Sequence, residues 1–385
     1  MGGTRNRCGR QADSGQRQAL GRRTKRRDSG SVSGSASSLA AFNSVPVIDI
    51  SGLRSEQREE RERVAAEIGT AAREVGFFYI SGSGIDESAF ERMLAATKEF
   101  FALPLEEKMR SYIGLSRCHR GYVPVGEEGL ESDNPPDLKE AFDTALDLPG
   151  DDPDHLAGNP MLGPNTWPDL PGFAEAVTAY YQAVIDVGRQ LLWAFAVALG
   201  EDPEVFSRHA TKTPSQLRLM HYPFNPDAKD AQGIGAHTDY ECFTLLKPTA
   251  PGLEVLNGAG EWIDVPPVDG TFVVNIGDLL ELWTNGTFVA TSHRVRRVSQ
   301  ERYSFPLFFN VDYHTEVKPL PRFVAGDGPQ RPALRAGEHL FAQTAQTFAY
   351  LRRRMQAGEL VLPDGSLATG QFGRQAELGV GTPVS

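Results

Sequence analysis

The chain is most informative between residues 233 and 246, which read GIGAHTDYECFTLL. Residues 243–246 are apolar apart from one threonine, and we expect a β-strand there that includes the preceding His237 and Asp239. Side chains two positions apart lie on the same face of a strand. The imidazole and the carboxylate are therefore predicted to point in the same direction.

A second pair of polar positions follows further along the chain. His293 comes 54 residues after Asp239 and lies on a predicted strand, 289–298. Arg302 and Ser304 share one face of the next predicted strand, which begins at Arg302 and ends at residue 311. The polar link between these two strands is short enough for a hairpin turn. Polar pairs inside apolar strands argue against a merely structural polar cluster.

These residue types together favour a metal centre. Two neutral imidazoles and one carboxylate, from His237, His293 and Asp239, offer three ligands and leave other positions of the metal open. This set suits a non-haem Fe(II) centre that binds oxygen and an organic co-ligand. The planar guanidinium of Arg302, with Ser304 beside it, suits the far carboxylate of such a co-ligand.

With these residues the chain resembles the iron- and 2-oxoglutarate-dependent oxygenases of the isopenicillin N synthase-like group. The resemblance spans about residues 45–320 and includes VPVIDI at 45–50, EVGFFYI at 74–80 and FFALPLEEK at 100–108. It implies a double-stranded β-helix, or jelly roll, whose mouth holds the iron. It also implies Fe(II) as the metal, with 2-oxoglutarate and O₂ as co-substrates.

The resemblance assigns roles to individual residues. His237, Asp239 and His293 would bind iron, and no catalytic side chain is predicted beyond these ligands. Arg302 and Ser304 would bind the C5 carboxylate of 2-oxoglutarate.

One position departs from the family pattern of Asn-x-Tyr before the triad. Tyr222 is present and is predicted to contact the C1 end of 2-oxoglutarate, but Met220 stands at the asparagine position. A thioether donates no hydrogen bond, so this corner differs from the family pattern.

Candidate substrate contacts come from several segments. Arg120 lies where a related peptide oxidase holds a substrate carboxylate, although a solvent-facing loop arginine is an equal alternative. Tyr122 follows it, and Tyr240 and Phe243 follow the first metal ligands. Phe309 lies on the strand of Arg302. We predict that these aromatic side chains line the substrate cavity, with core packing as the alternative.

The coarse organisation is mainly β with flanking helices (α+β), built on a jelly-roll core. We expect helices at 58–75, 87–101, 173–199 and 336–356, and substrate-covering loops in the Gly/Pro-rich stretch 113–171. The predicted regions are a disordered basic tail (1–41), an N-terminal α/β oxygenase region with those loops (42–175), the Fe(II)/2-oxoglutarate core with its bracing helix (176–320), and a C-terminal helix with a mobile tail (321–385).

Composition and charge limit the setting. The three cysteines are scattered and form no framework, which favours a reducing compartment and a cytoplasmic protein. No apolar run is long enough for a membrane span. Residues 1–30 carry nine basic and two acidic side chains, so the remaining chain accounts for −18 against the total of −11. Such an acidic body argues against nucleic acid as the main ligand.

Three functions remain open from the sequence. The leading one is hydroxylation, desaturation or cyclisation of a small molecule, with 2-oxoglutarate, in secondary metabolism. The second is an isopenicillin N synthase-like oxidase without 2-oxoglutarate, in which Arg302 and Ser304 bind the substrate's own carboxylate. The third is a non-catalytic jelly-roll binding protein. The sequence leaves the oligomeric state open.

Overall fold

The computed structural model describes residues 41–129, 139–224, 232–296, 300–324, 331–364 and 366. The predicted basic tail, 1–41, lies outside these residues except for its last position. Two facing sheets form the core of the described chain. The larger sheet has eight strands in the order β1-β2-β10-β7-β12-β5-β4-β3, and the smaller has four in the order β6-β11-β8-β9. The predicted mainly β fold with flanking helices is confirmed.

The strands of the large sheet come from distant parts of the sequence. They are β1 (Val47–Asp49), β2 (Phe77–Ser81), β3 (Gly121–Val123), β4 (Glu140–Ala145), β5 (Gln216–Tyr222), β7 (Phe243–Pro248), β10 (Phe272–Ile276) and β12 (Arg302–Phe309). The small sheet contains β6 (Gln232–His237), β8 (Leu253–Leu256), β9 (Trp262–Asp264) and β11 (His293–Arg296). A short pair, β13 (Glu316–Val317) and β14 (Leu334–Arg335), lies apart.

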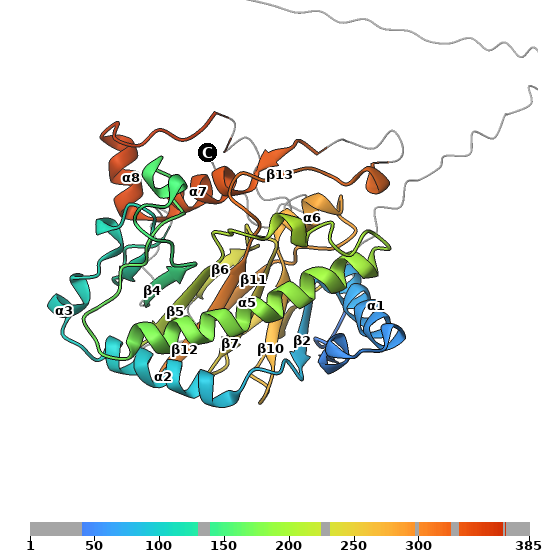
Figure 1. Ribbon diagram of the computed structural model, residues 1–385. Coiled ribbons are helices and arrows are strands. Elements are labelled where there is room, and N and C mark those ends of the chain that lie inside the picture. The colour runs from blue at the N-terminus through green and yellow to red at the C-terminus, as the bar shows by residue number, and fades with distance from the viewer. Residues whose placement is uncertain are drawn as a thin grey trace, which may run out of the picture. The chain divides into compact units, whose positions relative to one another are not determined.

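Helices flank the sheets (Figure 1). They are α1 (Arg58–Glu74), α2 (Glu87–Phe101), α3 (Leu105–Met109), α4 (Pro153–Leu156), α5 (Phe173–Ala198), α6 (Asp278–Trp283), α7 (Ala336–Thr347) and α8 (Ala349–Gln356). Helices α1, α2 and α5 lie on one face of the large sheet. Short 3₁₀ turns are η1 (Ser51–Arg54), η2 (Ile113–Leu115), η3 (Ser207–His209) and η4 (Pro321–Phe323). In the described ranges, no helix combines the length and apolar character that crossing a membrane requires.

The long helix α5 runs across the outer face of the large sheet (Figure 1). It packs on the sheet through a core that includes Phe195 of α5, Phe243 of β7 and Phe309 of β12. Gly188 allows the close approach, since a Cβ there would lie 2.3 Å from the Phe309 ring. This tight packing holds β12 in place from the side opposite the sheet interior.

The C-terminal helices cover another part of the large sheet. Leu340 and Phe341 of α7 and Leu351 of α8 share a core cluster with Met220 of β5 and Val123 of β3. We predicted a single helix over 336–356, but Phe348 has extended backbone angles (φ −97°, ψ 125°) and divides it into α7 and α8. The Phe348 ring packs edge-on against His119, 4.5 Å between centroids, and this contact favours the break.

The stretch 113–171 is more regular than predicted, because it contributes β3 and β4 to the large sheet. In β4 the inward Asp143 is fully buried and receives two hydrogen bonds from Arg218, at 2.7 and 2.8 Å. A charged residue at an inward position breaks the apolar alternation by which strands are recognised. The strand was therefore missed, although its polar group is fully paired.

The strands around the predicted metal ligands also differ from expectation. Strand β6 ends at His237, and β7 begins at Phe243 in the other sheet, so Asp239 lies on the loop between the sheets. Strand β11 begins at His293 rather than at 289. It pairs with β6 and β8, whereas β12 pairs with β5 and β7, so the predicted β11–β12 hairpin is wrong.

Candidate metal centre and co-substrate site

The two sheets bring His237, Asp239 and His293 together. His293 opens β11 directly opposite His237 in the β6–β11 register. Asp239 Oδ1 lies 3.7 Å from His237 Nε2 and 3.5 Å from His293 Nε2. One potential ligand atom from each residue lies within 4.8 Å of the others, and this is the one such group found in the described residues. Three donors at this spacing can share one metal ion.

The remaining polar atoms of the triad are engaged elsewhere. His237 Nδ1 lies 2.7 Å from the Gly235 carbonyl, and His293 Nδ1 lies 3.2 Å from the Thr291 carbonyl. A carbonyl can only accept, so both Nδ1 atoms carry the proton and both Nε2 lone pairs are left for a metal. The backbone thereby selects the tautomer that a metal ligand needs.

Two side chains orient the carboxylate. Asn275 of β10 donates to Asp239 Oδ2 at 2.7 Å, and the Thr244 hydroxyl of β7 donates to the same oxygen. Oδ1 therefore remains directed at the histidines. Neither Asn275 nor Thr244 was predicted, because their spacing from the aspartate follows from sheet pairing and leaves no sequence motif.

Electrostatics inside the site favour a cation. Burial, followed by the charge of His293, lowers the pKa of His237 to about 4, so this imidazole is neutral at physiological pH. Burial opposes ionisation of Asp239, but His293 and His237 hold its pKa well below the usual value. Burial lowers the pKa of His293, but the charge and hydrogen bond of Asp239, together with the Thr291 carbonyl, raise it above the usual value. A bound metal would take the place of protons at these donor atoms.

Arg302 and Ser304 share one face of β12, as predicted, and in the structure that face points inward. Both are buried, at 1% and 3% exposure. Arg302 Nε donates to the Ala250 carbonyl at 3.2 Å, and its guanidinium lies 4.9 Å from the centre of the Tyr222 ring. Arg302 Nη1 is buried without a hydrogen-bond partner among the described residues. A buried cationic donor in this state fits an anionic ligand.

Tyr222 and Met220 face the same interior from β5. In the β5–β12 register Tyr222 is opposite Arg302, and Met220 is opposite Ser304. The Tyr222 hydroxyl lies 3.9 Å from the Met220 sulfur. The departure from Asn-x-Tyr therefore places a weakly polar sulfur beside Arg302 and Ser304, the residues predicted to bind 2-oxoglutarate.

Arg120 and Tyr122 do not face the triad. The Arg120 guanidinium is fully buried and donates to the carbonyls of Cys118, His119 and Met161 at 2.6–2.9 Å. It is thus not a solvent-facing arginine, and both of its Nη atoms are engaged by backbone carbonyls. The Tyr122 hydroxyl donates to Glu140 at 2.7 Å, and its side chain belongs to the core under α5.

Phe243 and Phe309 also belong to that core. Their rings stack on each other with centroids 4.8 Å apart, and Phe195 of α5 packs on Phe243. Phe309 is five positions after Ser304, so strand alternation places it on the opposite face. We therefore withdraw both as substrate contacts. Tyr240 follows Asp239, is partly buried, and packs edge-on to His339 of α7, 6.4 Å between centroids.

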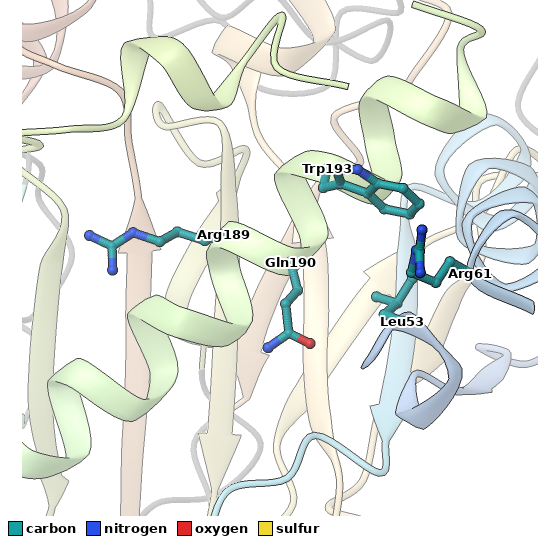
Figure 2. A pocket seen from close by; sticks show the side chains of 5 residues that line it. All are labelled: Leu53, Arg61, Arg189, Gln190 and Trp193. Atoms are coloured by element: carbon teal, nitrogen blue, oxygen red, sulfur yellow. The ribbon is translucent and has the colours of Figure 1, made fainter. Parts of the chain in front are cut away.

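A surface hollow of about 320 Å³ lies away from the triad (Figure 2). It is lined by side chains of η1, α1 and α5, namely Leu53, Arg61, Arg189, Gln190 and Trp193. The Arg61 guanidinium lies 5.8 Å from the Trp193 ring centre. These elements cover the outer face of the large sheet, so the hollow is separate from the metal centre.

Comparison with known proteins identifies the family. Residues 45–170 match the model of the N-terminal region of non-haem dioxygenases in morphine synthesis, and residues 213–311 match the 2OG-Fe(II) oxygenase superfamily. The 2-oxoglutarate-Fe(II) type oxidoreductase hxnY of Emericella nidulans is 35% identical over 300 residues, covering 75% of this chain and 86% of the relative. Homoarginine-6-hydroxylase 2-ODD-233 of rice is 34% identical, covering 80% and 98%. The chain belongs to the 2OG-Fe(II) oxygenase superfamily.

Solved structures agree with this assignment. A full-length Neurospora crassa protein in complex with alpha-KG superposes with a TM-score of 0.69 at 27% identity, covering 78% of this chain and 96% of that one. A 2OG-Fe(II) oxygenase family protein from Caulobacter crescentus gives 0.69 at 31% identity, covering 82% and 99%. The predicted jelly-roll core is confirmed. The protein is a non-haem Fe(II)- and 2-oxoglutarate-dependent dioxygenase, and the predictions of Fe(II), 2-oxoglutarate and O₂ are confirmed.

Proposed function

We propose that this dioxygenase oxidises an unactivated C–H bond of a small polar molecule, with His237, Asp239 and His293 as the iron ligands. The observation that carries this proposal is that each of the three residues directs one polar atom at a common point and binds a protein partner with the other. Asp239 Oδ1 and two Nε2 atoms converge, while each Nδ1 is bound to a backbone carbonyl and Oδ2 is bound to Asn275 and Thr244. Such outer partners are typical of metal ligands.

The second part of the proposal is that Arg302, Ser304 and Tyr222 hold 2-oxoglutarate by its far carboxylate and flank. The buried Arg302 Nη1 supports this role, since a carboxylate would satisfy it. Strand geometry supplies the spacing. Ser304 and Phe308 are four residues apart on β12, which is roughly 14 Å at the usual rise per residue. Phe308 is paired with Thr244, the residue that donates to Asp239. The co-substrate would occupy the interval between Arg302 and the metal.

Iron and 2-oxoglutarate, when bound, would supply the chemistry by which O₂ oxidises a C–H bond. The protein's own groups orient these components and keep water from competing. Buried Arg302 fixes one end, the triad fixes the other, and α7 with α8 covers the interior side of β3 to β5.

A charged wall near the triad supports a polar substrate. Arg218 binds both Asp143 and Glu128, and Lys139 lies 3.2 Å from Glu128. The charge of Lys139 acts on His237, and that of Glu128 acts on Tyr240, so the wall lies within electrostatic reach of the site. Three of the similar proteins are named for homoarginine, and a structure of the Neurospora crassa protein contains thymine. We propose a nitrogen-containing substrate of this size range.

The first experiment is an anaerobic titration. Fe(II) is added to the metal-free protein, followed by 2-oxoglutarate, and the visible charge-transfer band of the chelate is recorded. A saturable band is expected. Iron binding without a band would favour the oxidase alternative and substrates that bind iron themselves. Absence of iron binding would overturn the ligand assignment and leave a binding protein.

The substrate class is tested by coupled turnover. Small amines, amino acids, pyrimidines and apolar hydrocarbons of similar size are compared for substrate-dependent release of succinate from 2-oxoglutarate. Stimulation by the polar nitrogen compounds is expected. Stimulation confined to the hydrocarbons would contradict the role of the charged wall.

We propose a cytoplasmic setting. Cys118 and Cys242 are free and buried, and burial raises the pKa of the Cys242 thiol far above its usual value. Burial shields both thiols, and the raised pKa keeps the Cys242 thiol protonated, which suits a reduced state.

A further inference from the structure

His221 occupies an unusual place between two carboxylates. It lies on β5, between Met220 and Tyr222, with its ring on the outer face of the large sheet. Nδ1 is 2.9 Å from Glu140 Oε1 of β4, and Nε2 is 3.0 Å from Glu301 Oε1, immediately before β12. Each ring nitrogen thus faces a carboxylate oxygen from a different segment.

Only one protonation state satisfies both contacts. A neutral imidazole has a single N–H, so its other nitrogen would direct a lone pair at a carboxylate lone pair. The imidazolium donates from both nitrogens and binds both acids. His221 therefore joins Glu140 and Glu301 fully only when it is charged.

The groups on the Glu140 side strengthen this arrangement. Lys108 of α3 lies 2.7 Å from Glu140 Oε2, and the Tyr122 hydroxyl donates to the same oxygen at 2.7 Å. Oε1 is left for His221. Burial opposes ionisation of Glu140, but the hydrogen bonds from His221, Lys108 and Tyr122 keep its pKa below the usual value.

The groups on the other side are aromatic or bound to Glu301. The Tyr303 ring stacks on His221 with centroids 4.7 Å apart, and Phe101 of α2 lies 5.3 Å from His221. Lys98 of α2 lies over Tyr303, 5.6 Å from the ring centre. The Tyr303 hydroxyl also donates to Glu301, at 3.2 Å. Glu301 is the second anion that the ring faces, so the imidazolium meets two carboxylates and two aromatic faces.

This bridge lies beside the residues proposed to bind 2-oxoglutarate. In the β5–β12 register, His221 is opposite Tyr303, between the pairs Tyr222–Arg302 and Met220–Ser304. We propose that His221 is a positioning residue for 2-oxoglutarate. As an imidazolium it fastens the start of β12 to β5 and β4, and it releases that fastening when it loses its second proton. The inference rests on the proposed role of Arg302 and Ser304.

The direction of the pH effect follows from the charge. Deprotonation leaves the His221 ring one N–H for two carboxylates, so the bridge weakens as pH rises. The Glu301 side chain is 53% exposed, so solvent screens its ion pair. We expect 2-oxoglutarate binding to be roughly two- to fivefold weaker at pH 8.5 than at pH 6, beyond any other pH effect.

Glu301→Gln provides the matched control. An amide can accept from Nε2–H of the charged ring or donate to the bare Nε2 of the neutral ring, so it keeps the bridge at both pH values. The dissociation constant of 2-oxoglutarate is measured anaerobically on the Fe(II) protein. Wild type should lose two- to fivefold more affinity than E301Q between pH 6 and 8.5. Glu301→Ala should bind weakly at both pH values.

Hydrogen exchange reads the bridge without reference to the co-substrate. Protection of a peptide covering residues 300–308, corrected for intrinsic exchange, should fall with pH in wild type but not in E301Q. Equal protection profiles in the two proteins would overturn the bridge. Different protection with parallel 2-oxoglutarate affinities would overturn the positioning role. If Arg302→Lys left 2-oxoglutarate affinity unchanged while protection still differed, the proposed function would be at fault instead.

Discussion

The two faces of β12 perform different tasks within eight residues. Arg302 and Ser304 point into the jelly roll, where they are buried with a guanidinium nitrogen still lacking a protein partner among the described residues. Phe305, Leu307 and Phe309 point outward and are buried in the core beneath α5. Because side chains alternate along the strand, neighbouring residues of β12 serve either co-substrate binding or the stability of the fold. Substitutions on the two faces should therefore have separable effects.

The largest effect is expected at the metal. Asp239→Ala removes the anionic ligand, so stoichiometric Fe(II) binding should be lost, as measured by metal analysis after anaerobic dialysis. Asn275→Ala keeps the ligand but frees its outer oxygen, and iron affinity should fall by about 10- to 100-fold. Retained stoichiometric iron in D239A would remove Asp239 from the site.

The outer face is tested by Phe309→Ala. Loss of this buried ring should lower the free energy of unfolding by about 3–5 kcal/mol, measured with denaturant, while Fe(II) and 2-oxoglutarate affinities stay near wild type. Gly188→Ala sharpens the test. Its methyl group would meet the Phe309 ring, so it should destabilise wild type but be tolerated in the F309A background. Additive effects would show that the two residues do not pack together.

The covering helix α7 should make stability depend on pH. Burial lowers the pKa of His339 to about 4, whereas an unfolded histidine has a pKa of about 6.5. The unfolded chain therefore binds more protons between these values. Stability present above pH 6.5 should be lost as pH falls toward 4, by up to about 3 kcal/mol. His339→Leu should flatten this part of the unfolding profile. An unchanged slope would place the dependence on other groups.

A smaller effect than those of Asp239→Ala and Phe309→Ala is expected at the inward arginine. Arg302→Lys keeps the charge but loses the planar fork, so 2-oxoglutarate should bind more weakly by about 1.5–3 kcal/mol, with iron still bound. The charge-transfer titration measures this directly. Unchanged co-substrate affinity would refute the assigned role of the inner face.

Prediction from the sequence succeeded where local pattern decides structure. The helix at 87–101 was located at both ends, because its apolar spacing is a local feature. It failed where a distant partner compensates a local irregularity. Strand β4 was missed because its inward Asp143 is neutralised by Arg218, 75 residues away. The partners of Asp239 were missed for the same reason.

The alternation rule itself would have corrected one error. Phe309 is an odd number of positions from Ser304, so it had to lie on the face of the strand opposite Arg302 and Ser304. For Phe243 no such rule was available, since the chain changes sheets between Asp239 and β7. The face of a strand can be inferred along one strand but not across a loop.

The sequence by itself determined the chemistry of this protein. Two histidines, an aspartate and an Arg-x-Ser pair are residue types that suit a metal and a dicarboxylate, whatever their exact placement. Only the tertiary structure decided which atoms face that metal. The carbonyls of Gly235 and Thr291, the side chains of Asn275 and Thr244, and the outer bridge at His221 come from segments that meet through sheet pairing and loop path, and these long-range contacts are not encoded in any local spacing.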